Sequence, residues 1–384
     1  MLRPIPLTQY LGTLSSLGFD EKDLLADTKI DPAAMRDPRY LVLADDNFGP
    51  QTSKTANACI RYTPERVVGV IDASQAGRTA QQVLGFGGDI PVVATLEEGL
   101  RLEPNALLIG IAPAGGQLPT SWIALLARAI EHGLDIWSGL HNFIGDIPQL
   151  ATLARTHGVT IRDLRRPPAS LDVSNGRVRD VTATVVLTVG TDCNIGKMTT
   201  QLQLLDGLRA RVIRTSFAAT GQTGILIEGR GVGVDAVIAD FIGGAAEQLV
   251  LECAKDADLV LVEGQGSIIH PSYSGVTYGL LHGSLPHAQV MCAQPSRTAI
   301  NRAEWVKIPP LVDFIRMSEA AAAPLRPAPV IAVALNTYDL DDDAAQRAVD
   351  TVQRETGLPT TDPVRFDPAP VADAIARFHA TRPR

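Results

Sequence analysis

The sequence is poor in several features that would point to particular classes of protein. Only 5% of its residues are aromatic and its net charge is -8, so it offers few rings for base stacking and no basic excess for phosphate backbones. Nucleic acid is therefore an unfavourable partner. Its four cysteines form no C-x-x-C pair, and this scattered spacing indicates neither a disulfide framework nor a metal site.

Long apolar runs are also absent. No segment approaches the ~20 consecutive apolar residues of a membrane span, and no charged-then-apolar leader precedes a cleavage site. We therefore expect a soluble, cytoplasmic protein without a membrane partner. The chain has 384 residues, of which 45% are hydrophobic, and this is too long for one ordinary core, so two α/β domains are expected.

The order of apolar and amphipathic segments predicts three parts. Residues 1–36 have apolar residues at helical spacing and indicate a helical N-terminal extension. Residues 37–170 alternate strand-like and helix-like segments, the pattern of a Rossmann-like parallel-sheet domain with ligands at the carboxyl ends of its strands. Residues 171–384 predict a second α/β domain.

Smaller features subdivide the second half of the chain. Residues 162–180 have the composition of a basic, proline-interrupted linker, with a hairpin turn at Asn175-Gly176. The strands that follow are expected at 184–189, 210–215, 257–263, 288–291 and 329–335.

The most informative segment joins a β-branched run to a helix through a glycine-containing turn. It reads Thr188-Val-Gly-Thr-Asp-Cys-Asn-Ile-Gly-Lys-Met-Thr-Thr200. Gly190 and Gly196 allow a tight turn in which backbone N–H groups point at an anion, and the helix N-terminus adds positive potential. Lys197 supplies a further positive charge for phosphate oxygens. The segment therefore predicts a phosphate-binding loop, and the second domain is expected to be P-loop NTPase-like.

This loop departs from the usual G-x-x-x-x-G-K-[ST] pattern in two ways. Five residues separate Gly190 from Gly196, and Met198 stands where a hydroxyl normally ligates Mg²⁺. Thr199 lies one position further on, about 100° around the helix. We expect the loop to bind phosphates, whereas phosphoryl transfer is not favoured.

An acid at the end of another predicted strand supports a ligand site. Residues 256–263 form an apolar run that closes on Glu263, in the position of a Walker B acid, and such strands open at the ligand crevice of a parallel sheet. The next segment, Gly264-Gln-Gly-Ser-Ile-Ile-His270, begins with small residues that let a ligand approach the backbone.

These motifs resemble a known group of proteins. The loop and Val262-Glu-Gly-Gln-Gly266 are similar to the dethiobiotin synthetase branch of P-loop proteins. The chain resembles more closely a two-domain family long catalogued as a domain of unknown function, which includes D-glutamate N-acetyltransferase. That likeness covers roughly residues 40–384 and includes the segments 219–224, 234–240, 263–271 and 282–286.

The resemblance implies acetyl transfer from acetyl-CoA to the amine of an acidic amino acid, with D-glutamate as the substrate, in a homo-oligomeric enzyme. Such a reaction needs no catalytic metal, and the phosphates of CoA suit the loop without a hydroxyl at position 198. An amine is mostly protonated at neutral pH, so a general base is required. Glu263 and His270 are the first candidates for this base, and Asp192 is a third.

Two other functions remain open at this point. An ATP-dependent carboxylate ligase or small-molecule kinase, similar to dethiobiotin synthetase, would use Mg²⁺ held by Asp192, Thr199 and Glu263. A nucleotide-responsive binding protein without turnover would change the angle between its domains when the loop is occupied.

The remaining predictions concern binding residues. The predicted cofactor-binding residues are Gly190, Thr191, Asp192, Cys193, Asn194, Ile195, Gly196, Lys197, Met198, Thr199 and Asn336. The predicted substrate-binding residues are Thr220, Gln222, Thr223, Gly264, Gln265, Ser267, His282 and Arg297. Asn336 ends a strand where an amide could read an adenine edge, and His282 is expected in a loop. Arginine is included because its planar fork suits carboxylates, and Arg214, at the end of a predicted strand, is an alternative to Arg297.

Overall fold

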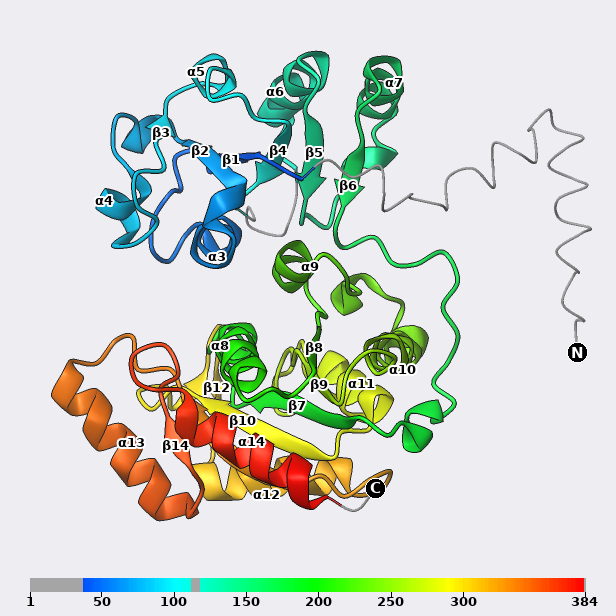
Figure 1. Ribbon diagram of the computed structural model, residues 1–384, viewed down its shortest axis with the longest axis vertical. Coiled ribbons are helices and arrows are strands. Elements are labelled where there is room, and N and C mark those ends of the chain that lie inside the picture. The colour runs from blue at the N-terminus through cyan, green and yellow to red at the C-terminus, as the bar shows by residue number, and fades with distance from the viewer. Residues whose placement is uncertain (1–36, 112–117, 383–384) are drawn as a thin grey trace, which may run out of the picture.

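The computed structural model describes residues 37–111 and 118–382, which form two α/β domains, one above the other in Figure 1. The helices predicted within residues 1–36 lie outside the described residues. Each domain is built on a six-stranded sheet in which all neighbouring strands are parallel. The prediction of two parallel-sheet α/β domains is therefore confirmed.

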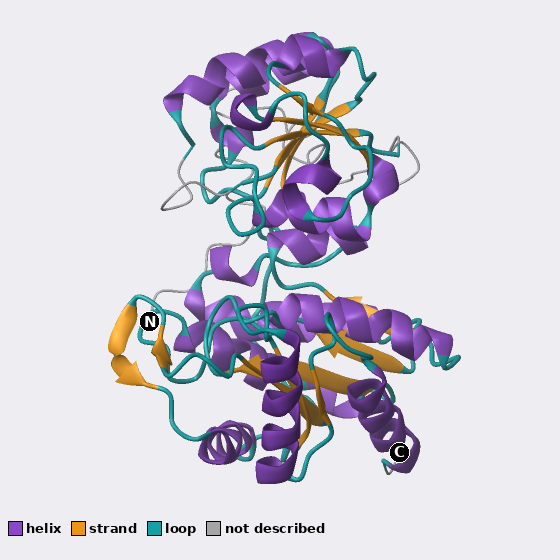
Figure 2. Cartoon of the chain, turned by 90° about the vertical axis from the view of Figure 1, so that its left-hand side faces the viewer, coloured by secondary structure: helices purple, strands orange, loops and turns teal. Residues whose placement is uncertain are grey.

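The N-terminal domain has the strand order β3-β2-β1-β4-β5-β6, and helices cover both faces of its sheet (Figure 2). The central strands β1 and β4 are buried at every residue, as expected for parallel strands with both faces covered. The elements are β1 (Tyr40–Leu43), α3 (Lys54–Tyr62), β2 (Val67–Ile71), α4 (Ala80–Leu84), β3 (Val92–Val93), α5 (Leu96–Leu100), β4 (Ala106–Ile109), α6 (Thr120–Glu131), β5 (Asp135–Ser138), α7 (Pro148–His157) and β6 (Ile161–Asp163).

The C-terminal domain has the strand order β14-β13-β10-β7-β9-β8, together with a separate antiparallel hairpin, β11–β12. Its elements are β7 (Thr184–Gly190), α8 (Lys197–Ala210), β8 (Thr215–Ala218), α9 (Gln222–Glu228), α10 (Ile242–Cys253), β9 (Leu259–Val262), α11 (Ser274–Ser284), β10 (Ala288–Ala293), β11 (Ala299–Ile300), β12 (Ala303–Lys307), α12 (Leu311–Ala322), β13 (Val330–Leu335), α13 (Asp342–Thr356), β14 (Thr360–Thr361) and α14 (Ala369–Thr381). Within the described ranges, no helix is both long and apolar enough to cross a membrane.

Strand β7 shows why the strands of this sheet are mainly apolar. Successive side chains of a strand point to opposite faces. Val185 and Leu187 join the core formed with α10, α11 and α12, whereas Val186 joins the core formed with α8 and α14. Both faces are covered by helices, so a polar side chain loses hydration there unless it gains a hydrogen bond, as Thr188 does from the N–H of Gly264.

The prediction of a strand at residues 210–215 is wrong in position, because the strand β8 spans Thr215–Ala218. Helix α8 continues to Ala210 because Leu205 and Leu208 are buried at helical spacing against the sheet. The chain then turns with Val212 in the left-handed conformation, at φ 60°, and β8 begins only at Thr215.

The linker predicted over 162–180 also needs correction. Its first residues belong to the edge strand β6, which pairs with β5 through backbone hydrogen bonds. The hairpin expected at Asn175-Gly176 does not form. Gly176 adopts φ 73° and leads into a 3₁₀ turn, Arg177–Asp180, so the glycine makes a single reversal without a pairing strand.

The carboxyl edges of the two sheets face one another across the domain interface. Helix α3, which follows β1, packs against α9, which follows β8, and the two lie side by side in Figure 1. The hydroxyls of Thr55 on α3 and Thr223 on α9 are 3.4 Å apart. Arg165, just after β6, forms an ion pair with Asp235 of the other domain. Loops at the ligand-binding edges of both sheets therefore share one interface.

Candidate functional site

The predicted phosphate-binding loop forms between β7 and α8. The turn has Asn194 at φ 55° and Gly196 at φ 94°, and α8 begins directly after Gly196. Close packing explains the glycine at the start of the loop. A Cβ on Gly190 would lie 2.7 Å from Ile195 Cδ1 and 3.3 Å from the carbonyl oxygen of Cys292. The backbone thus turns tightly at the positive end of a helix, the arrangement that binds phosphate in other loops of this kind.

Lys197 and Met198 lie in different environments. Lys197 Nζ donates a hydrogen bond to the carbonyl oxygen of Asp192 at 2.7 Å, within the loop, and burial lowers the pKa of this lysine. Met198 is partly buried and packs against the apolar cluster of α8 and α14. The position that usually supplies a hydroxyl for Mg²⁺ therefore holds an apolar side chain packed against the protein interior.

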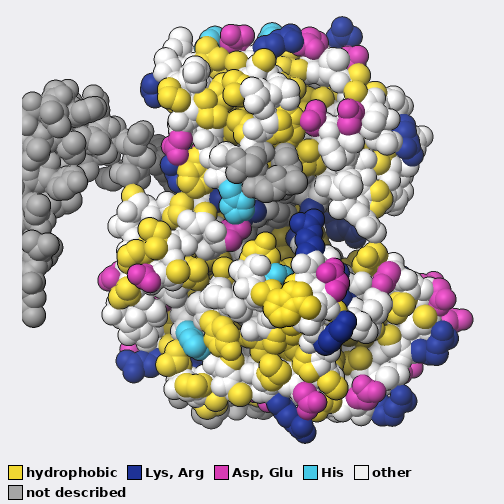
Figure 3. Space-filling view, turned by 180° about the vertical axis from the view of Figure 1, so that it is seen from behind, with side chains coloured by type: hydrophobic (Ala, Val, Ile, Leu, Met, Phe, Trp, Pro, Cys, Tyr) yellow, Lys and Arg dark blue, Asp and Glu magenta, His cyan; other side chains and the backbone are white. Residues whose placement is uncertain are grey.

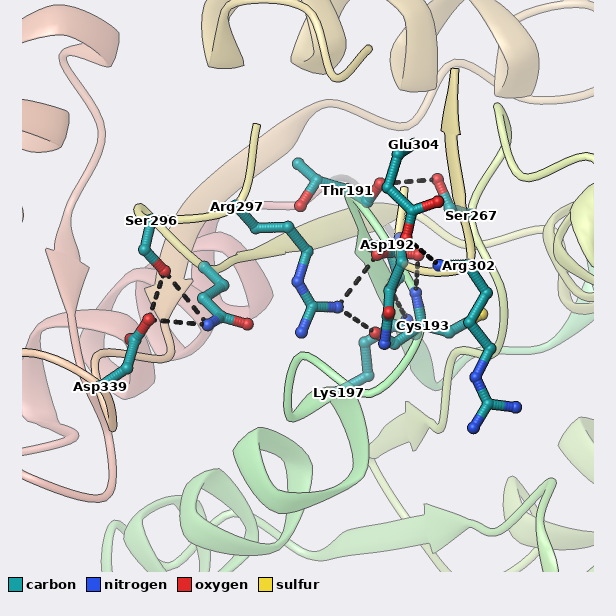
Figure 4. Close-up of polar contacts among 12 residues, drawn as sticks. Thr191, Asp192, Cys193, Lys197, Ser267, Ser296, Arg297, Arg302, Glu304 and Asp339 are labelled. Atoms are coloured by element: carbon teal, nitrogen blue, oxygen red, sulfur yellow. Dashed lines mark hydrogen bonds and ion pairs between the residues drawn. The ribbon is translucent and has the colours of Figure 1, made fainter. Parts of the chain in front are cut away.

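Asp192 holds the loop to the hairpin β11–β12 (Figure 4). Its Oδ2 accepts hydrogen bonds from Arg297 Nη1 at 3.0 Å and from the backbone N–H of Asn301 at 2.9 Å, and its Oδ1 accepts one from the N–H of Cys193 at 2.6 Å. Arg297 Nη1 also donates to the carbonyl oxygen of Cys193 at 2.8 Å. Asp192 is completely buried, so its carboxylate is committed to loop structure, and Arg297 Nη1 is engaged in the same contacts.

Glu263 directly follows β9 and is held by the segment after β8. Its Oε2 accepts hydrogen bonds from the backbone N–H groups of Thr220 at 2.9 Å and Gly221 at 3.1 Å. The Thr220 hydroxyl donates to the carbonyl oxygen of Glu263 at 2.8 Å, and Gln265 Nε2 donates to the carbonyl oxygen of Thr220 at 2.6 Å. Gly224 provides the room for this arrangement, because a Cβ there would lie 2.6 Å from Glu263 Oε2.

The carboxyl group of Glu263 has the properties of a proton acceptor. The residue is only 6% exposed, and this burial raises its pKa above the ordinary value because the ionised form loses hydration. The two backbone N–H donors and the charges of Lys54 and Lys197 act in the opposite direction but do not reverse the shift. A raised pKa makes this carboxylate a stronger base than an ordinary glutamate side chain, as general base catalysis requires.

Two cations of the N-terminal domain lie near this carboxylate. Lys54 Nζ, at the start of α3, donates to Asn194 Oδ1 of the loop at 3.3 Å. Lys54 reaches solvent, yet the protein that surrounds it lowers its pKa, while the charge of Glu263 acts to raise it. Burial lowers the pKa of Arg165 to about 10, again against the charge of Glu263. Figure 3 shows Lys and Arg side chains gathered at the furrow between the domains.

Lys54 and Arg165 were missed by the sequence analysis. Lys54 is 140 positions from its partner in the loop, and Arg165 is 70 positions from Asp235. No local motif marks either cation, since only the packing of one domain on the other brings them to the site.

His270 lies close to Asp192 and Cys193, and the potential ligand atoms of the three residues are within 4.8 Å of one another. His270 Nδ1 accepts a hydrogen bond from the backbone N–H of Ser272 at 3.1 Å, which assigns the proton of the neutral ring to Nε2. Burial lowers the pKa of His270 and raises that of the Cys193 thiol. This ring has no free lone pair for a substrate proton, and the guanidinium of Arg297 beside Asp192 disfavours a cation in the group.

A pocket of about 410 Å³ opens beside the loop. Asn336, predicted to bind the cofactor, lies there at the end of β13, and its Nδ2 would be 3.8 Å from a Cβ on Gly196. The pocket is lined by Ile195, Gly196, Thr199, Thr200, Leu335, Asn336, Tyr338, Asp362, Pro363, Val364 and Arg365. It joins the phosphate-binding turn to a partly apolar cavity, which suits the adenosine part of a nucleotide.

The other predicted substrate-binding residues lie in the segments that follow β9 and β8, next to Glu263. Gly264 N–H donates to Thr188 Oγ1 at 3.0 Å, and a Cβ on this glycine would lie 1.7 Å from the carbonyl oxygen of Thr188. Ser267 Oγ donates to the carbonyl oxygen of Thr191 at 3.1 Å, which links the segment after β9 to the loop. Gln222 and Thr223 begin α9 at the domain interface.

His282 is not in a loop, contrary to expectation. It belongs to the last turn of α11, where a ring nitrogen, Nε2, lies 3.0 Å from the carbonyl oxygen of Ala321. Since α11 leads into the start of β10, His282 lies toward the opposite edge of the sheet from the loop. Arg214 precedes β8 rather than ending a strand and pairs with Asp258 at that same far edge.

The fold and the site define the class of protein. It combines a P-loop α/β domain with a Rossmann-like domain, and Lys54 of the Rossmann-like domain contacts the loop. The chain belongs to the DUF1611 family. Residues 73–167 match its Rossmann-like N-terminal domain of unknown function, and residues 172–372 match its P-loop domain of unknown function. The resemblance noted from the motifs is thereby confirmed.

Individual relatives extend this match. A protein of Tritonibacter scottomollicae named D-glutamate N-acetyltransferase is 36% identical over 342 residues, which are 88% of this chain and 98% of the relative. A Pseudoalteromonas protein of the same name is 34% identical over 329 residues, 85% of this chain and 96% of that protein. The crystal structure of a DUF1611 family protein from Anabaena variabilis has a TM-score of 0.85 at 39% identity and covers 88% of this chain and 99% of its own.

Proposed function

We propose that the protein is an N-acetyltransferase that moves the acetyl group of acetyl-CoA to the amine of an acidic amino acid, with D-glutamate as the substrate. Two relatives of that name support the proposal. Within the site, one observation carries it: Glu263 is a buried carboxylate close to the phosphate-binding loop, with Lys54 and Arg165 nearby. The site thus combines a carboxylate that could accept a proton from the substrate amine with two cations that could bind the substrate carboxylates.

The loop and its pocket suit CoA. The pyrophosphate would bind the backbone N–H groups between Gly190 and Gly196 together with Lys197, and the adenine would lie against Asn336. Acetyl transfer has no γ-phosphate to neutralise, so Met198 in place of a Mg²⁺-binding hydroxyl is compatible with the reaction. The acetylated end of CoA would then lead from the loop toward Glu263.

Glu263 would begin the reaction by taking one proton from the ammonium group of the substrate. The neutral amine then attacks the thioester carbonyl carbon, a C–N bond forms, and the C–S bond to CoA breaks. A second proton leaves the nitrogen and is taken up by the departing thiolate. The overall exchange yields the N-acetylated amino acid and CoA and releases one proton to solvent.

Lys54 and Arg165 are the proposed partners of the substrate carboxylates. Lys54 has solvent access, and its only described hydrogen bond is the 3.3 Å contact with Asn194. Arg165 is anchored by its ion pair with Asp235 and by a hydrogen bond from Nε to the carbonyl oxygen of Gly139, so it supplies a fixed positive charge near Glu263 rather than a free set of donors. Arg297 was the first choice from the sequence, but its Nη1 is committed to Asp192 and to the loop backbone.

An ATP-dependent ligase or kinase is the second candidate, because the loop and pocket suit ATP as well as CoA. The expected Mg²⁺ ligands favour it less. Asp192 is occupied by Arg297 and Asn301, and Glu263 accepts two backbone N–H groups.

The test is to identify products by mass. The purified protein is incubated with acetyl-CoA, or with ATP and Mg²⁺, in the presence of the D- and L-forms of glutamate, aspartate and alanine. We expect N-acetylated D-glutamate with acetyl-CoA and no product with ATP. An ATP-dependent product would establish the second candidate, and binding of either nucleotide without any product would indicate a binding protein.

A further inference from the structure

Among the described residues that line the pocket beside the phosphate-binding loop, Arg365 is the single Lys or Arg. Its side chain is 22% exposed, so most of its surface is covered by the protein around the pocket. The same pocket includes Gly196, at the start of α8, and Tyr338, a largely exposed aromatic residue. A nucleotide whose phosphates bind the loop would therefore place its nucleoside near this arginine.

The backbone of Arg365 is held by a buried acid. Asp362 is 3% exposed, and its Oδ1 accepts hydrogen bonds from the backbone N–H groups of Val364 at 2.9 Å and Arg365 at 3.1 Å. Its Oδ2 accepts hydrogen bonds from the N–H of Thr337 at 2.9 Å and from the Thr337 hydroxyl at 2.6 Å. Both oxygens of Asp362 are thus used in building the turn that carries Arg365.

The guanidinium itself is only weakly engaged. Arg365 Nη1 lies 3.1 Å from Asp342 Oδ1, but Asp342 is 92% exposed, and pairs with such an exposed partner contribute little. Within the described part of the chain, Arg365 Nε and Nη2 have no hydrogen-bond partner. A planar fork with free donors is the arrangement that binds a phosphate through two parallel hydrogen bonds.

CoA and ATP share an adenosine 5′-diphosphate, but only CoA has a phosphate on the ribose 3′-oxygen. We infer that Arg365 binds this 3′-phosphate and thereby gives the site its preference for CoA over adenine nucleotides without it. The inference rests on the proposed function, since it identifies the nucleotide as CoA. It assigns to the pocket a subsite for a phosphate monoester, separate from the pyrophosphate subsite of the loop.

Calorimetric titration tests the inference without turnover. Wild type, Arg365→Met and Arg365→Lys are each titrated with CoA, with 3′-dephospho-CoA and with ADP. We expect wild type to bind CoA at least about tenfold more tightly than 3′-dephospho-CoA, because a charge-assisted contact is present only with CoA. Arg365→Met should bind the two alike, and Arg365→Lys should keep part of the preference.

Two further variants keep the outcome interpretable. Arg354→Met removes an exposed arginine of α13 outside the pocket and should retain the full preference for CoA. Asp342→Asn releases Arg365 from its exposed partner and should leave the preference intact or increase it. Equal binding of CoA and 3′-dephospho-CoA by wild type, or an undiminished preference in Arg365→Met, would overturn the inference. Acetyl transfer could still occur in either case, whereas wild type that binds ADP but not CoA would refute the proposed function itself.

Discussion

Replacement of Glu263 by glutamine separates the basicity of this side chain from its structural role. The glutamine oxygen can still accept hydrogen bonds from the N–H groups of Thr220 and Gly221, so the site should keep its shape. Only the capacity to take a proton is lost. We expect turnover to fall on the order of 10²-fold or more, which corresponds to about 2.7 kcal/mol of transition-state stabilisation. CoA affinity, which depends on the loop, should be nearly unchanged.

The same substitution should stabilise the protein at neutral pH. Burial raises the pKa of Glu263, so ionisation of this group opposes folding. For a raised pKa, the contribution to stability is fully present below the unfolded value of about 4.3 and is lost as pH rises through the folded value. Glutamine does not ionise. The melting temperature of the variant relative to wild type should therefore increase from about pH 4 upward and level off above the folded pKa.

Both effects are measured with matched samples. Rates are followed with acetyl-CoA and D-glutamate from about pH 6 to about pH 9, and melting curves are recorded over the lower range as well. His270→Asn is the comparison and should keep most of its turnover, because Nδ1 of His270 is already occupied by Ser272. Near-normal turnover of Glu263→Gln would refute the assignment of the base. Loss of turnover only in His270→Asn would transfer that role to the histidine.

Four other predictions follow from the geometry. Lys197→Ala should weaken CoA and ATP binding by roughly 1.5–3 kcal/mol because one charge-assisted contact is lost, and unchanged affinity for both in calorimetry would remove the loop from the site. Lys54→Met should raise the KM for D-glutamate about tenfold, with partial recovery in Lys54→Arg, and an equal change for D-alanine would contradict a role with the second carboxylate. Gly224→Ala should lower turnover because its Cβ would displace a carboxylate oxygen 2.6 Å away, whereas Gly275→Ala, with nothing within 4 Å, should not; equal rates would show that the carboxylate position is not critical. Acetyl transfer should survive EDTA, and a loss restored by Mg²⁺ would favour the ATP-dependent candidate.

Local sequence signals predicted much of the C-terminal site. The glycines at 190 and 196 and the lysine after them formed the expected turn at a helix N-terminus. Glu263 directly follows β9, and Asn336 directly follows β13, as the apolar runs before them indicated. These features are predictable because a strand buried on both faces and a tight glycine turn each depend on a few consecutive residues.

Local signals failed where tertiary packing decided the outcome. Residues 210–215 contain apolar residues that could extend a strand, but burial of Leu205 and Leu208 favours a longer helix α8. Arg297 has the chemistry for a substrate carboxylate, yet Asp192 lies close enough to engage it. His282 is followed by Gly283-Ser-Leu-Pro286, a sequence typical of a loop, and nevertheless it belongs to the last turn of α11.

The sequence by itself determined that this protein has two α/β domains, that a glycine-containing loop of the second leads into a helix at Lys197, and that Glu263 follows the adjacent strand. Each of these depends on residues that are neighbours in the chain. Only the tertiary structure decided that Lys54 and Arg165 lie near Glu263 and that Arg365 reaches the pocket beside Gly196. The carboxyl edges of parallel sheets bring together loops that are far apart in sequence, and docking of one domain on the other adds cations that no motif marks.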